Sequence, residues 1–143
     1  MNRREAGERA TLTERFQRDL VIVSCAVSAG LHAGLVPEHL AESRALGGSF
    51  ALATVLLAAV AAALSRRPGS SAVLAAAGAL FAGLIASYAL AVTVGLPFLH
   101  PDPEPVESVA VLTKTVETVG LLAAVGLLRA SHLANPQVKG ELT

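Results

Sequence analysis

Four long apolar stretches alternate with short polar segments along the chain. The apolar stretches cover residues 19–36, 45–64, 72–96 and 106–128. Each one is long enough to cross a hydrocarbon layer of about 30 Å as an α-helix. The segment between the second and third stretches, Ser65 to Gly69, ends in the turn-forming pair Pro68-Gly69. The pattern therefore predicts an all-α bundle of four transmembrane helices.

The polar ends of the chain, residues 1–18 and 131–143, are predicted to be tails outside the membrane. Lys and Arg bias the segments that carry them toward the cytoplasm. With the amino terminus inside, the inner segments would hold Arg3, Arg4, Arg9, Arg15, Arg18, Arg66, Arg67, Arg129 and Lys139, and the outer loops only Arg44. No small-residue cleavage site follows the first stretch, so we expect an uncleaved span. We predict a multi-pass protein of the plasma membrane with both termini in the cytoplasm.

The composition agrees with this class and excludes others. Hydrophobic residues make up 53% of the chain, charged residues 15%, and the mean hydropathy is +0.60, which is typical of a membrane protein. Zero net charge and 3% aromatic residues argue against nucleic-acid binding. The single cysteine, Cys25, excludes an internal disulfide, and we interpret it as a small buried hydrophobe. No nucleotide-binding glycine loop, nucleophile elbow or paired-cysteine motif occurs, so we predict that the protein is not an enzyme.

Small residues recur at four-residue spacing in three of the predicted helices. These stripes are Ala26, Gly30 and Gly34; Ala75, Ala79, Gly83, Ser87, Ala91 and Gly95; and Gly120 with Ala124. Membrane helices pack closely where small residues let their backbones approach. We interpret the stripes as packing faces inside the bundle, with a homodimer contact as the alternative.

Polar residues form one edge on the first predicted helix and one on the fourth. Ser24, Ser28 and His32 lie on one face of the first. On the fourth, Glu107, Lys114, Thr118 and Leu121 share a stripe from which Glu117 is offset. Polar groups in hydrocarbon need partners. We therefore expect the two edges to face each other, and we expect the hydroxyl of Tyr88 to reach His32 or Glu117.

Two ionisable residues, Lys114 and Glu117, fall inside the fourth predicted span. One interpretation is an ion or proton path that runs from Glu107 through Lys114 to Glu117. The other is a neutralised pair, three residues apart on one helix, that holds the helices in register. The sequence leaves both open.

Histidines and carboxylates gather on the predicted outer side. His32, Glu38, His39 and Glu42 lie within eleven residues, and Pro37 is expected to open a short surface helix in the 36–45 loop. His100 lies in the second outer loop. Imidazole and carboxylate ligands suit a divalent transition metal better than Cu(I). These five residues are the candidate metal ligands, and the alternative is that the acidic loops are simply solvated.

Several of these motifs resemble those of a known class of protein. The residues that carry the resemblance are the segments Pro37-Glu38-His39-Leu40-x-Glu42, Thr93-Val94-Gly95-Leu96-Pro97 and Pro105-Val106-Glu107, together with His32 and Glu117. Through them, the chain resembles small four-span integral membrane proteins of high-GC bacteria that have no established activity. The resemblance covers most of residues 20–128. It implies a four-helix membrane protein and directs attention to the outer His and Glu residues.

Two functions follow as hypotheses. The first is a small membrane protein that handles a metal, a cation or protons at its outer face. The second is a non-catalytic accessory subunit, either of a homo-oligomer or of a larger membrane complex, whose small-residue faces pack against its partner. A conduit through a single copy is not evident from four short helices, so transport would need an oligomer or a partner.

Overall fold

The computed structural model describes residues 3–96 and 102–134, with side chains from residue 11 onward. In these ranges the chain forms α1 (Arg3–Glu42), α2 (Arg44–Arg66), α3 (Ser71–Thr93) and α4 (Ser108–Ala134). Each helix contains a stretch long and apolar enough to cross a membrane. The prediction of an all-α chain with four such helices is therefore confirmed, and the architecture is that of a multi-pass membrane protein.

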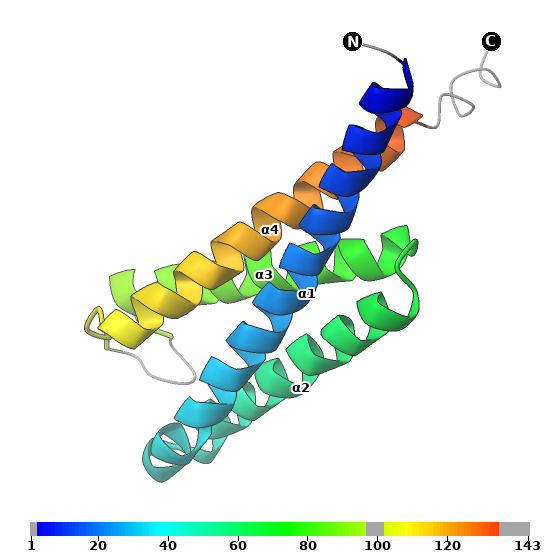
Figure 1. Cartoon of the computed structure of the whole chain (residues 1–143). Coiled ribbons are helices and arrows are strands. Elements are labelled where there is room, and N and C mark those ends of the chain that lie inside the picture. Colours follow the sequence, from blue (N-terminus) through cyan, green and yellow to red (C-terminus); the bar gives the residue numbers. More distant parts are fainter. Residues whose placement is uncertain (1–2, 97–101, 135–143) are drawn as a thin grey trace, which may run out of the picture.

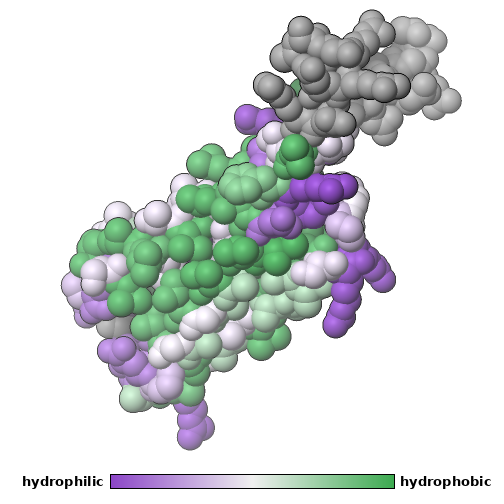
Figure 2. Space-filling model, viewed as in Figure 1, coloured by the Kyte–Doolittle hydropathy of each residue, from purple (hydrophilic) through white to green (hydrophobic). Residues whose placement is uncertain are grey.

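The helices run alternately up and down (Figure 1). Helix α1 packs along α2 and α4, α3 packs on α4, and α2 and α3 contact each other less closely than these pairs do. The first turns of α1 and the last turns of α4 extend together beyond the α2–α3 connection (Figure 1). On the face seen in Figure 2, hydrophobic residues cover the middle of the bundle and hydrophilic residues gather toward its ends. The cytoplasmic location of the two termini stays a prediction.

Helix α1 is longer than the sequence suggested. It runs without a break for 40 residues and includes Pro37. The expectation of a separate surface helix opening at Pro37 is therefore wrong, whereas the end of the membrane span at Val36 stays a prediction. Pro37 is exposed, so its ring faces away from the bundle, and the helix ends only at Glu42.

A single residue, Ser43, connects α1 to α2. Its backbone is extended, with φ −157° and ψ 136°, and its hydroxyl oxygen accepts a hydrogen bond from the Leu46 amide at 3.2 Å. The Ser43 amide in turn donates to the His39 carbonyl at 2.9 Å. Serine is a preferred N-cap because its side chain satisfies a free amide of the first turn. The predicted 36–45 loop is thus a tight helical hairpin.

The connection from α3 to α4 begins with a glycine turn. Helix α3 ends at Thr93, three residues before the predicted limit, and Gly95 has φ 76°. This left-handed conformation just after a helix strongly favours glycine. Further on, the Glu104 amide donates to the Ala91 carbonyl at 3.0 Å, which ties the connection back to α3. Pro97 and His100 lie outside the described residues.

The core lies between all four helices. Phe81, Val21 and Cys25 are fully buried there, which confirms the interpretation of Cys25 as a buried hydrophobe. A Cβ at Gly120 would come within 2.7 Å of both the Phe81 ring and the Ser24 side chain. Ala124, one turn further on, is also fully buried. The predicted packing role of this small pair on α4 is confirmed.

The small-residue stripes on α1 and α3 lie mostly on the outside. Ala26, Gly30 and Gly34 are exposed, as are Ala75, Ala79, Gly83 and Ser87; only Ala91 and Gly95 are buried. Among the described residues, and apart from the glycine's chain neighbours and the nearby backbone of its own helix, no heavy atom lies within 4 Å of a Cβ built on Gly30, Gly34 or Gly83. The interpretation of these stripes as packing faces inside the bundle is therefore wrong, because α1 turns its Ser24, Ser28 and His32 face inward instead.

Candidate functional site

A buried carboxylate lies at the centre of the candidate site. Glu117 of α4 has no exposed surface. One of its oxygens accepts a hydrogen bond from the Ser28 hydroxyl of α1 at 2.8 Å, and the other accepts from the Lys114 ammonium at 2.6 Å. The Lys114 ammonium also donates to the Leu84 carbonyl of α3 at 3.2 Å. The Glu117 carboxylate of α4 is therefore bonded directly to α1 and, through the Lys114 ammonium, is connected to α3.

His32 stands beside this carboxylate. Its Nδ1 lies 2.9 Å from the Ser28 carbonyl, and because a carbonyl only accepts, Nδ1 carries the hydrogen of that bond. The lone pair of the neutral ring is then on Nε2, which lies 3.9 Å from Glu117 Oε1. A proton added at Nε2 would face a carboxylate. We call Ser28, His32, Lys114 and Glu117 the buried cluster.

The buried cluster confirms that the polar edges of α1 and α4 face each other, but it corrects the edge of α4. Thr118 is exposed, and Thr113, Glu117 and Gly120 face the bundle. These positions are separated by four and three residues, which is the spacing of one helix face. Glu117, which the sequence placed off the stripe, is thus the inward residue. The spacing of Thr113, Glu117 and Gly120 was the signal in the sequence that could have identified Glu117 as an inward residue.

Tyr88 does not make the predicted bond. Its hydroxyl is buried and has no hydrogen-bond partner within the described ranges. The Lys114 ammonium instead lies 5.6 Å from the centre of its ring, at a distance compatible with a cation–π contact. The polar end of Tyr88 is therefore left unsatisfied by the described part of the chain.

A pocket of about 410 Å³ lies against the buried cluster, at the end of the bundle that holds the α1–α2 and α3–α4 connections. His32, Thr113 and Lys114 form part of its wall. Glu117 is not in the wall but lies directly behind Lys114, to which it is bonded. The pocket therefore gives direct access to His32 and Lys114 and, through them, to Glu117.

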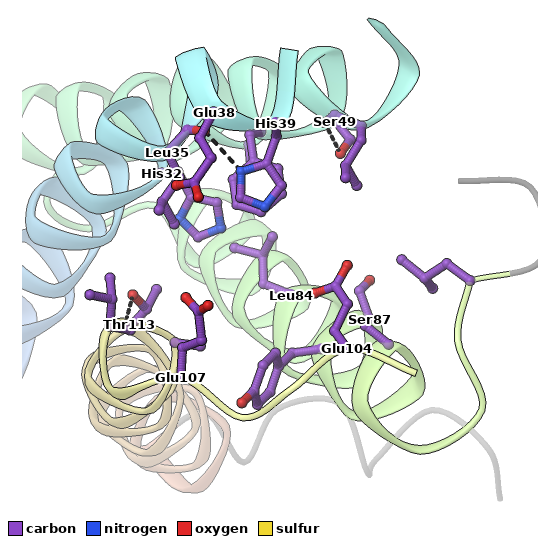
Figure 3. Close-up of a pocket in the computed structure, with 18 of the residues that line it drawn as sticks. His32, Leu35, Glu38, His39, Ser49, Leu84, Ser87, Glu104, Glu107 and Thr113 are labelled. Atoms are coloured by element: carbon purple, nitrogen blue, oxygen red, sulfur yellow. Dashed lines mark hydrogen bonds between the residues drawn. The ribbon is translucent and has the colours of Figure 1, made fainter. Parts of the chain in front are cut away.

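Carboxylates from different elements enter this pocket. Glu38 of α1, Glu104 of the α3–α4 connection and Glu107 just before α4 point toward its centre (Figure 3). Glu42 lines it as well. Glu107, Lys114 and Glu117 thus follow one another from the exposed side of the pocket to the buried cluster. An ion path along these three residues stays a prediction.

The predicted metal ligands share the pocket without forming a ligand cluster. His32, Glu38, His39 and Glu42 all line it, whereas His100 lies outside the described residues. In the described part of the chain, no three His, Cys, Asp or Glu side chains come together as a metal would require. The His39 ring is stacked on Phe50, with centroids 3.9 Å apart, and its Nδ1 is 2.9 Å from the Leu35 carbonyl. Metal binding stays a prediction.

Phe50 is a site residue that the sequence did not single out. It lies on α2 between two histidines, with its centroid 3.9 Å from that of His39 and 5.5 Å from that of His32. Its place depends on the one-residue hairpin at Ser43, which brings the first turns of α2 against the last turns of α1. Being the only aromatic residue of its span was the one signal available.

Comparison with protein-family models, with curated proteins and with solved structures gave no significant match to this chain.

The metal prediction can be tested on the two histidines. Because the described ligands do not converge, we expect a His32→Ala/His39→Ala variant to retain as much zinc as the wild type. The measurement is metal content by mass spectrometry after purification in mild detergent. Loss of about one equivalent of zinc in the variant would contradict this expectation and would show that the two histidines do form a metal site.

Proposed function

We propose that the chain is a proton-handling membrane protein whose pocket admits cations and whose buried cluster accepts and releases a proton. The observation that carries this proposal is the fully buried Glu117, bonded to Ser28 and Lys114 and facing Nε2 of His32 behind the pocket wall. Ionisable groups at membrane depth are costly and commonly mark ion or proton pathways.

The chemistry of the buried cluster supports exchange of a proton. The Lys114 ammonium neutralises the Glu117 carboxylate, so the pair can lie in an apolar environment without a net charge. The neutral His32 ring offers an acceptor nitrogen on the other side of the same carboxylate. A proton would therefore have two alternative sites, the Glu117 carboxylate and Nε2 of His32, which lie 3.9 Å apart. His32 and Lys114 would connect these two sites to the pocket.

The distribution of charge favours a pocket that opens on the extracytoplasmic side of the plasma membrane. Glu38, Glu42, Glu104 and Glu107 are at the pocket end of the bundle, and Arg66 and Arg67 are at the opposite end, where α2 joins α3. Lys and Arg favour the cytoplasmic side. Protons or cations would then enter the pocket from outside the cell.

A hydrophobic carbodiimide tests this proposal, because it modifies carboxyl groups that are protonated and lie in an apolar environment. We expect dicyclohexylcarbodiimide to label Glu117 and the labelling to increase as the pH falls, as read by peptide mass spectrometry of the protein in nanodiscs. The Glu117→Gln variant serves to identify the labelled position. If Glu117 of the wild type stays unlabelled at every pH at which the bundle remains folded, the carboxylate is a permanently ionised structural partner and the proposal is wrong.

The outward small-residue stripes favour a second candidate, a subunit that associates with another copy or with a larger membrane complex. The open faces at Gly30, Gly34 and Gly83 are of the kind that lets membrane helices approach closely. Under this function the pocket carboxylates would only be solvated.

If the chain is such a subunit, a large side chain introduced on one of these small-residue faces should disrupt its association with another copy. We expect Gly83→Leu to reduce the molecular mass of the detergent-solubilised protein from an oligomer to a monomer, as measured by light scattering. Ala82→Leu is the matched control, because Ala82 is also exposed but lies on the next face of α3. A monomeric wild type, or an oligomer that survives in Gly83→Leu, would speak against a homo-oligomer through this face.

A further inference from the structure

The size and wall of the pocket indicate an organic ligand. Its volume of about 410 Å³ lies within the range of about 300–1,000 Å³ typical of small-molecule sites. Much of the wall is apolar and comes from all four helices and the α3–α4 connection: Leu35, Leu46, Phe50, Leu84, Leu96 and Val109. Apolar side chains cannot replace the hydration shell of a bare metal ion, but they can cover a hydrocarbon body.

The charge of the wall indicates that the ligand is a cation. The carboxylates of Glu38, Glu104 and Glu107 point toward the pocket centre from three places in the chain (Figure 3). Lys114 is the only Lys or Arg among the described residues that line the pocket, and its ammonium is bonded to Glu117. The remaining carboxylates thus give the pocket a negative potential, which concentrates cations.

Two polar atoms in the wall are suited to an N–H donor. The buried Tyr88 hydroxyl has no partner within the described part of the chain, and leaving such a group unpaired is costly. The Nδ1 hydrogen of His39 is used by the Leu35 carbonyl, so a neutral His39 has its lone pair on Nε2. Both residues line the pocket. An ammonium group can donate to either atom.

From these features we propose that the pocket binds an organic ammonium ion. Its charged head would lie among Glu38, Glu104 and Glu107, and its apolar body against Leu46, Phe50 and Leu84. This inference rests on the proposed function of the pocket as a cation site and names the class of cation.

The test is binding of 4-phenylbutylammonium to the protein in nanodiscs, measured by calorimetry with empty nanodiscs as the reference. We expect saturable binding, and binding of the neutral 4-phenylbutanol that is weaker by about tenfold or more. The Glu38→Gln/Glu107→Gln variant should lose about tenfold in affinity for the ammonium ion. Glu14→Gln, on α1 near the opposite end of the bundle, is the matched control and should bind as the wild type does.

Other outcomes overturn the inference in distinct ways. Equal binding of the alcohol and the ammonium ion would show an apolar cavity without charge selection. Binding of Zn²⁺ alone, with no binding of the ammonium ion, would restore the metal interpretation. If the ammonium ion does not bind and the carbodiimide still labels Glu117, the ligand class is wrong and the proton-handling function stands. If the ammonium ion binds and Glu117 is never labelled, the ligand class is right and the proton-handling function is wrong.

Discussion

A Lys114→Met variant is expected to lower the free energy of unfolding by about 3–5 kcal/mol, because it leaves a buried carboxylate without its counter-ion. The Lys114 ammonium is 2.6 Å from Glu117, which has no exposed surface. Glu117→Gln should have an effect of similar size, since it leaves the lysine charge unpaired. The free energy can be measured by unfolding in mixed micelles of increasing dodecyl sulfate content.

The double variant separates a charge effect from a simple loss of packing. In Lys114→Met/Glu117→Gln neither charge remains, and the glutamine oxygen can still accept the bond from Ser28. We expect the double variant to be more stable than either single variant, because replacing a buried ion pair by neutral groups is often close to neutral. If the two single effects simply add in the double variant, the two groups do not act as a pair.

A Gly47→Ala variant is expected to be the most damaging single change in the α1–α2 hairpin. A Cβ at Gly47 would lie 2.6 Å from the Leu40 nitrogen and 2.7 Å from its Cα, and would also meet its Cγ. Two of these atoms are backbone, so the collision can be relieved only by moving α1 away from α2. Overpacking of this kind typically costs about 1–3 kcal/mol, and we expect Gly47→Ala to lower the free energy of unfolding by about 3 kcal/mol.

The neighbouring residue provides the matched control for this change. Gly48 lies in the same turn of α2, and no atom of another described segment lies within 4 Å of a Cβ built there. Gly48→Ala should raise the free energy of unfolding, by up to about 1 kcal/mol, because alanine is the better helix former. Equal effects of the two variants would contradict the close contact between the start of α2 and the end of α1.

The number and approximate place of the helices could be predicted because each needs a long apolar stretch to cross a membrane. The end of α1 could not. Pro37 is a residue that usually begins or interrupts a helix, and only the cap at Ser43 shows where α1 stops. The four-residue spacing of Ala26, Gly30 and Gly34 identified a helix face correctly. It did not say whether that face looks into the bundle or out of it.

The candidate site could be predicted in part. The need of polar groups for partners in hydrocarbon was enough to place Ser28 and His32 opposite the polar residues of α4. It placed Thr118 on the inward stripe of α4 and Glu117 off it, whereas Glu117 is the buried residue and Thr118 is exposed. The contact of Phe50 with His39 depends on the geometry of the hairpin. The lack of a partner for the Tyr88 hydroxyl among the described residues depends on the exact depth of α3. Neither is encoded in local spacing.

The central claim is that Glu117 gains and loses a proton while the bundle stays folded. The most direct measurement is infrared difference spectroscopy of the protein in nanodiscs between high and low pH, comparing the wild type with Glu117→Gln. We predict that a band of a protonated carboxyl group in an apolar environment appears in the wild type at low pH and is missing in the variant. If the difference spectra of the two proteins are the same in that region, Glu117 does not exchange its proton, and the buried cluster is a structural ion pair.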